Sequence, residues 1–109
     1  MDGCNILFPL VKKIDPLAVL RIKANITLQH DTQLKHDFHV DITNTTNPSV
    51  MVSILYMNTN NGWTEFEDGA KVDSVANRLV TFPNNMKHTS VSCTDTTYRM
   101  VLNFNYVTS

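Results

Sequence analysis

Residues 20–29 read LRIKANITLQ, an apolar and a polar residue in strict alternation. Successive side chains of a β-strand point to opposite faces of a sheet, so this pattern predicts a half-buried strand. Strand-like composition also occurs at residues 50–56, 63–67, 78–82 and 98–107. The turn signal Asn60-Asn61-Gly62 predicts a hairpin that joins residues 50–56 to residues 63–67, and Asp68-Gly69 predicts a further turn. Many short strands with regularly spaced turns predict an all-β sandwich or barrel.

The N-terminal end has a different pattern. Apolar residues between Ile6 and Ile14 follow a helical spacing, and Asp15-Pro16 ends this short predicted helix. A chain of 109 residues has room for a single core, so we expect one domain over residues 1–109.

Composition excludes several classes of function. The net charge is −1 and the nine basic residues are scattered, which argues against a nucleic-acid partner. No apolar run approaches the roughly 20 residues that cross a bilayer, so no membrane association is expected. Cys4 and Cys93 lack a C-x-x-C spacing and are expected to be free thiols in a reducing cytoplasm.

The segment with the clearest chemistry is residues 38–42, which read FHVDI. In a strand His39 and Asp41 would project from one face, with the three apolar side chains on the other. An imidazole and a carboxylate are costly to bury unless something compensates them, and a divalent metal would do so. His88 would complete a 2-His-1-carboxylate triad, which holds Fe(II) and leaves coordination positions open.

The rest of the chain resembles a known family in order and in motif. The resemblance is to the Fe(II)- and 2-oxoglutarate-dependent oxygenases, in their prolyl-4-hydroxylase-like branch, and it spans residues 17–107. Besides the H-x-D segment and an arginine eleven residues after His88, it is carried by four stretches: Ile54-Leu55-Tyr56-Met57-Asn58, Gly62-Trp63-Thr64-Glu65-Phe66, Asn77-Arg78-Leu79-Val80-Thr81-Phe82-Pro83 and Tyr98-Arg99-Met100-Val101-Leu102-Asn103-Phe104.

The resemblance implies a double-stranded β-helix, that is, a cupin-like jelly roll with a short N-terminal helix. It implies Fe(II) bound by His39, Asp41 and His88, and 2-oxoglutarate held by Arg99 and Tyr56. Arginine suits that role because its planar fork matches a carboxylate bidentately.

The implied reaction consumes O2 and 2-oxoglutarate, hydroxylates a C–H bond and releases succinate and CO2. A peptide, an amino acid and a small metabolite remain open as substrates, and ascorbate remains open as an accessory reductant.

Some positions depart from the family pattern. Val101 replaces a hydroxylated residue of many relatives, so one contact to the cosubstrate is expected to be missing, and Asn103 could supply another polar contact. Asn61 replaces the first glycine of a G-G-x-T-x-F motif. The role of Trp63 is left open between lining a substrate entrance and simple packing.

Two alternatives to an active enzyme stay open. One is a jelly-roll binding or structural module that holds a metal without turnover, or holds none. The other is an inactive, truncated oxygenase, because few residues precede the first strand. Arg99 and Tyr56 favour the enzyme, since a simple metal binder needs no cationic anchor for a dicarboxylate. His30 and His36 are interpreted as structural or solvated.

Strand parity also predicts an apolar outer surface. If the His39 strand and the closing strand share a sheet, one face gathers eight apolar side chains: Phe38, Val40, Ile42, Tyr98, Met100, Leu102, Phe104 and Tyr106. The Ile6–Ile14 helix is expected to cover this surface incompletely. The remainder would be buried by homo-oligomerisation, by a partner or by additional N-terminal sequence.

Overall fold

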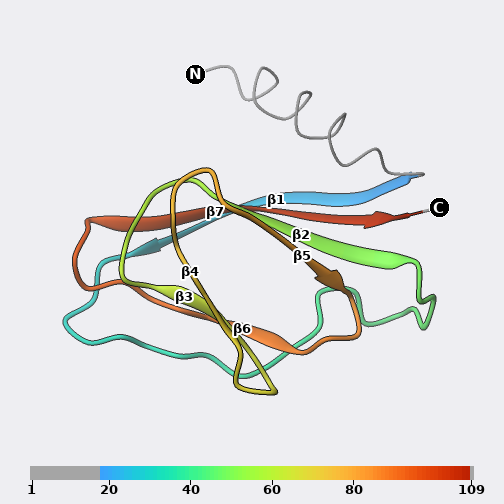
Figure 1. Cartoon of the computed structure of the whole chain (residues 1–109), viewed down its shortest axis with the longest axis horizontal. Helices are drawn as coiled ribbons and strands as arrows, with labels where there is room; N and C mark the ends of the chain where they lie inside the picture. Colours follow the sequence, from blue (N-terminus) through green and yellow to red (C-terminus); the bar gives the residue numbers. More distant parts are fainter. Residues whose placement is uncertain (1–17, 109) are drawn as a thin grey trace.

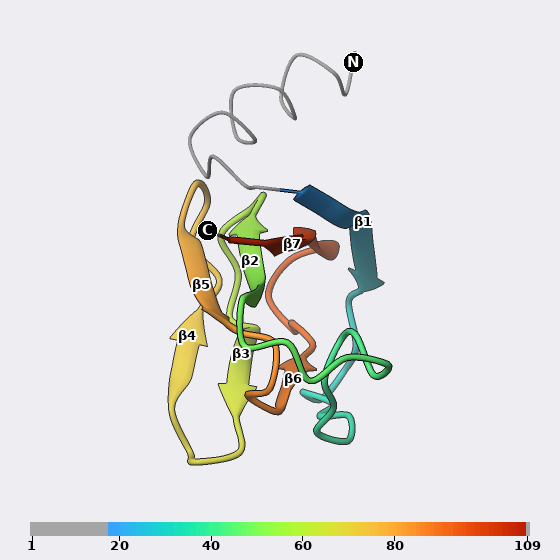
Figure 2. The same ribbon diagram turned by 90° about the vertical axis from the view of Figure 1, so that its right-hand side faces the viewer.

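The computed structural model describes residues 18–108, which form two antiparallel β-sheets packed face to face (Figures 1 and 2). The larger sheet has the order β1 (Ala18–Leu28), β7 (Tyr98–Val107), β2 (Val50–Tyr56), β5 (Leu79–Pro83). The smaller sheet has the order β4 (Lys71–Asp73), β3 (Trp63–Phe66), β6 (His88–Val91). The predicted all-β sandwich is therefore confirmed for this part of the chain.

The core lies between the two sheets. Its buried members come from both of them: Val52, Ile54 and Tyr56 of β2, Phe66 of β3, Phe82 of β5 and Val101 of β7. Phe66 and Phe82 meet edge to face across the layers, with ring centroids 4.9 Å apart. Burying each such side chain stabilises the fold by about 1.5–3 kcal/mol.

The predicted hairpin between residues 50–56 and 63–67 is wrong. Strands form at both places, but β2 belongs to the larger sheet and β3 to the smaller one, where β3 pairs with β4 and β6. The turn at Gly62 thus carries the chain from one layer to the other. A Cβ atom at Gly62 would lie 2.6 Å from the carbonyl oxygen of Val91, so only glycine fits this crossing without displacement.

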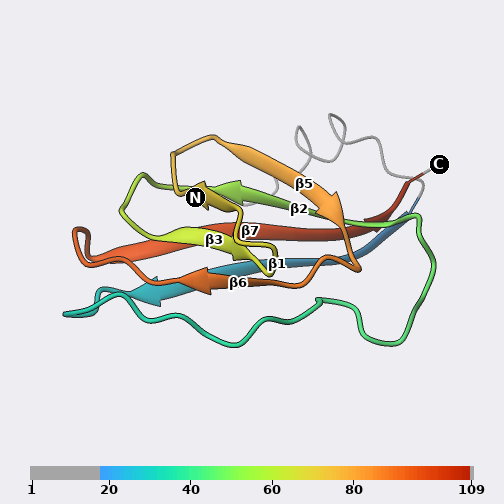
Figure 3. The same ribbon diagram turned by 60° about the horizontal axis from the view of Figure 1, so that its bottom comes forward.

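The predicted strand around His39 is also wrong. Among the described residues, this segment makes a single bridge, in which the His39 and His88 backbones exchange hydrogen bonds of 2.9 and 3.0 Å. Figure 3 shows the segment between β1 and β2 running beside β6 of the smaller sheet. Residues 38, 40 and 42 are half-buried there and do not join the outer face of β7. The alternation of apolar and polar residues over 38–42 therefore accompanies a single bridge, and no ladder of strand pairs forms there.

Strand β1 is an edge of the larger sheet and pairs only with β7 among residues 18–108. The prediction that it is half-buried is wrong, because its apolar row stands exposed, with Ile26 62% and Leu28 67% accessible. This row lies beside the outer side of β7, where Leu102, Phe104 and Tyr106 form a second cluster. An apolar outer face therefore exists, built from β1 and β7.

The helix expected at Ile6–Ile14, and Cys4, lie outside the described residues. Within residues 18–108 no helix is long and apolar enough to cross a membrane.

Candidate metal centre

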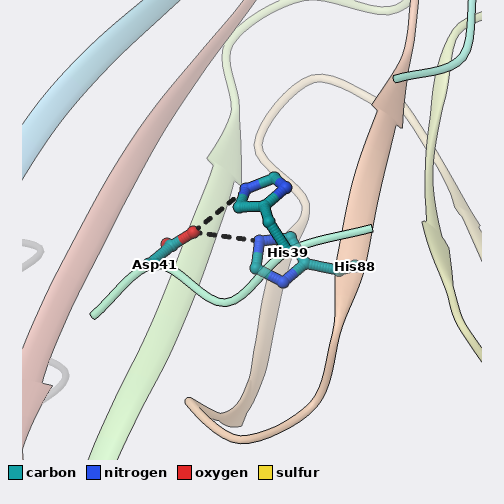
Figure 4. Close-up of side chains that lie close together, drawn as sticks. All are labelled: His39, Asp41 and His88. Carbon is teal, nitrogen blue, oxygen red and sulfur yellow. Dashed lines mark ion pairs between the residues drawn. The ribbon is translucent and has the colours of Figure 1, made fainter. Parts of the chain in front are cut away.

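His39, Asp41 and His88 converge at one end of the space between the sheets, as the sequence predicted. Their potential ligand atoms all lie within 4.8 Å of one another. Oδ1 of Asp41 is 3.4 Å from Nε2 of His39 and 3.2 Å from Nε2 of His88, and Figure 4 shows both rings turned toward that oxygen. The backbone bridge between the two histidines sets their spacing, with ring centroids 4.6 Å apart.

Asp41 is held in place although no strand contains it. The backbone bridge holds His39, two residues before Asp41, and Asn84 hydrogen-bonds to the backbone of Ile42, the residue after it. The side-chain oxygen of Asn84 accepts from the amide of Ile42 at 3.1 Å, and its NH2 group donates to the carbonyl of Ile42 at 2.9 Å. Asn84 is buried. The loop therefore has the rigidity that a metal ligand needs.

Each histidine is oriented by a backbone carbonyl. Nδ1 of His88 lies 3.2 Å from the carbonyl of Met86, and Nδ1 of His39 lies 3.4 Å from that of Asp37. A carbonyl can only accept, so each Nδ1 carries a proton, and Nε2 is the ring nitrogen that each histidine directs toward Asp41. Lone pairs and a carboxylate oxygen facing one point require a proton or a cation between them. This donor set fits a divalent metal, with second-neighbour contacts typical of metal-bound histidine.

The Asp41 carboxylate is suited to remain ionised. Its side chain is 3% exposed, and burial by itself would raise its pKa. Hydrogen bonds from His88 and Asn105 outweigh that effect and hold the pKa of Asp41 well below its usual range. At neutral pH the site therefore offers one negative ligand, the Asp41 carboxylate.

The centre opens into a cavity of about 390 Å³ between the sheets. His39, His88 and Arg99 all line it, and so does Asn103. Residues 24–27 of β1 also line it. Two of the three candidate metal ligands and the predicted anchor for an acidic ligand thus line one cavity.

Arg99 is the charged group of this cavity that lacks a charged partner among the described residues. It is 4% exposed, and its guanidinium donates to the hydroxyls of Ser74 at 3.0 Å and Thr64 at 3.4 Å. No carboxylate of residues 18–108 lies within ion-pairing distance of it. Burial lowers the pKa of Arg99, but a guanidinium stays protonated in proteins. A buried charge with neutral neighbours is costly, and an anion in the cavity would compensate it.

Tyr56 lies near Arg99 but does not line the cavity. Its hydroxyl donates to Oγ1 of Thr64 at 2.7 Å, and its ring lies 5.8 Å from the Arg99 guanidinium carbon. Burial raises the pKa of Tyr56, which keeps it a neutral donor. Thr64 does line the cavity and accepts from both residues, so its own proton is left for a ligand. The direct role predicted for Tyr56 stays a prediction, and Thr64 is the hydroxyl that sequence reasoning missed.

Trp63 lies away from the cavity lining. Its indole N–H donates to Glu65 at 3.1 Å, and the ammonium group of Lys71 stands 4.8 Å above its ring. This arrangement is packing on the smaller sheet. His30 and His36 are exposed and outside the metal cluster, in line with their interpretation as solvated residues.

No protein-family model and no curated protein matches the sequence. Among solved structures, the chain is similar to a Pseudomonas putida prolyl-4-hydroxylase, with a TM-score of 0.64 and 16% identity over 99% of this chain and 66% of that one. It is also similar to an RmlC-like cupin protein from Desulfovibrio desulfuricans, with a TM-score of 0.50 and 12% identity over 79% of this chain and 82% of that one. The fold is a cupin-like jelly roll. At these identities the likeness concerns the fold alone, and the chain spans just under two thirds of the hydroxylase.

Proposed function

We propose that this protein is an Fe(II)- and 2-oxoglutarate-dependent dioxygenase that hydroxylates a C–H bond and releases succinate and CO2. The observation that carries the proposal is Arg99, a buried guanidinium with neutral partners in the same cavity as a His-Asp-His cluster. A metal alone explains the cluster. It does not explain a cation inside the cavity, whereas a dicarboxylate that bridges metal and arginine explains both.

In this proposal His39, Asp41 and His88 hold Fe(II), and the iron supplies the activation of O2 when bound. Arg99 and Thr64 bind the distal carboxylate of 2-oxoglutarate, Arg99 by its charge and Thr64 by its free proton. Tyr56 acts through Thr64, and Asn103 offers an amide to the same ligand. Peptides, amino acids and small metabolites remain the candidate substrates.

A non-catalytic metal-binding jelly roll is the second candidate. The likeness to a cupin protein is compatible with it, because that fold needs only the His-Asp-His cluster to hold a metal. An inactive, shortened oxygenase is a third, since the chain spans 66% of the hydroxylase. Neither alternative explains why a guanidinium with only neutral partners among residues 18–108 is buried in the cavity, and we therefore prefer the enzyme.

Succinate formation tests the proposal. Purified protein would be incubated with Fe(II), 2-oxoglutarate and O2, with and without prolyl peptides and amino acids. We expect iron-dependent succinate that Asp41→Ala abolishes while the fold is retained. Asp31→Ala removes an exposed carboxylate outside the cluster and is the matched control. Unchanged turnover in Asp41→Ala, or no succinate from iron-loaded wild type with any substrate class, would contradict the proposal.

A further inference from the structure

A chain of hydrogen bonds leads from the protein surface to the far oxygen of Asp41. Nε of Arg21, an exposed residue of β1, donates to Oδ1 of Asn105 at 3.1 Å. Nδ2 of Asn105 donates to Oδ2 of Asp41 at 3.0 Å. The other carboxylate oxygen, Oδ1, faces His39 and His88. The two oxygens of Asp41 therefore have separate tasks, and Asn105 contacts only the one that faces away from the histidines.

Arg21 contributes to fixing which way the Asn105 amide points. A guanidinium has no acceptor, so the amide oxygen must face Arg21 and the NH2 group must face Asp41. Asn105 is fully buried, and its amide has no solvent with which to exchange partners. Nδ2 of Asn105 also donates to Oδ1 of Asn103 at 3.4 Å, so Arg21, Asn103 and Asp41 together hold the amide in this orientation.

A β-bulge places Arg21 on the inner side of its strand. The register between β1 and β7 shifts between Val19 and Arg21, so that Arg21 pairs with Asn105. With the register of Val19 continued, Arg21 would pair with Phe104 on the outer face. Bulges commonly redirect a side chain beside a functional site, and here the redirected side chain is one that helps to orient Asn105.

We propose that Asn105, oriented with the help of Arg21, is a positioning residue. By donating a hydrogen bond to Oδ2 of Asp41 it restricts Asp41 to coordination of the metal through one oxygen. A carboxylate that bound through both oxygens would take up one more coordination position. Holding Oδ2 keeps that position open for cosubstrate or O2. The inference rests on the metal centre of the proposed function and is independent of 2-oxoglutarate turnover.

Metal binding tests this inference without an activity assay. Mn(II) affinity would be measured by anaerobic calorimetry, and the absorption bands of the Co(II)-loaded protein would report coordination number. Asn105→Ala should weaken Mn(II) binding by about 10- to 100-fold, the usual effect of losing such a second-neighbour contact. It should also change the Co(II) bands, because a freed Oδ2 could enter the coordination sphere of the metal. Arg21→Ala should cause a smaller loss in the same direction, and Arg21→Lys should recover part of it.

Lys23→Ala is the matched control, because it removes one positive charge from the same face of β1 without a contact to Asn105. Equal losses in Lys23→Ala and Arg21→Ala would show that only the electrostatic field matters and would overturn the inference. Wild-type affinity and spectrum in Asn105→Ala would overturn it as well. If Asn105→Ala does not fold, the exposed Arg21 series decides alone. Metal binding that follows this pattern without any succinate would leave the inference standing and refute the dioxygenase.

Discussion

Replacing Arg99 by lysine separates the anchor of the cosubstrate from the metal centre. The change keeps the charge but exchanges a planar fork for one nitrogen. Arg99 now donates to Ser74 and Thr64 through Nε and Nη2 while facing the cavity. A lysine ammonium cannot hold both hydroxyls and also bind a carboxylate through two parallel bonds. The variant should therefore retain iron and lose 2-oxoglutarate.

The magnitude follows from the number of bonds lost. One charge-assisted hydrogen bond contributes about 1.5–3 kcal/mol. Its loss raises the dissociation constant of 2-oxoglutarate roughly 10- to 150-fold. The metal ligands His39, Asp41 and His88 make no hydrogen bond to Arg99, so Mn(II) affinity should change by less than about twofold.

Calorimetry on Mn(II)-loaded protein without O2 measures the two affinities separately. Arg78→Lys is the matched control, because Arg78 donates to the carbonyl of Asp73 at an exposed site and does not line the cavity. It should bind 2-oxoglutarate as wild type does. If Arg99→Lys weakens both ligands equally, or neither, Arg99 is not the anchor and the reasoning from its burial fails.

Two further results are expected. Gly62→Ala should lower the free energy of unfolding in urea by about 1–3 kcal/mol. It should also weaken 2-oxoglutarate binding, because its Cβ would lie 2.8 Å from Cδ of Arg99. Gly69→Ala is the control, because φ is +94° there and no atom lies within 4 Å of the added Cβ. It should lower the free energy of unfolding by about 1–2 kcal/mol and leave 2-oxoglutarate binding intact. Equal 2-oxoglutarate binding by both variants would contradict this account. The exposed apolar row of β1 should make the wild-type chain associate, so light scattering should show mass rising with concentration and Ile26→Lys/Leu28→Lys should reduce it. A wild-type monomer at all concentrations would refute this.

Several strands could be predicted because their signal is local. β2 and β7 have the bounds that composition and alternation indicated, and β3 and β5 differ from the prediction by single residues. Short β4 and β6 were missed, because three or four residues carry too little periodicity. Pairing was predicted less well, since a strand's own pattern does not name its neighbour. That is why β3 was joined to β2, and why residues 38–42 were assigned to a strand.

The sequence by itself was enough to name the candidate metal ligands, which the structure brings within 4.8 Å of one another. His39, Asp41, His88 and Arg99 were recognisable from residue type, spacing and family likeness, because donor atoms and charge belong to the side chain and not to the fold. The tertiary structure decided which groups support them. Thr64 and Asn105 became part of the site only when two sheets closed over one cavity and a bulge aimed Arg21 at Asn105. Such contacts join residues as much as 84 positions apart, and no local pattern encodes them.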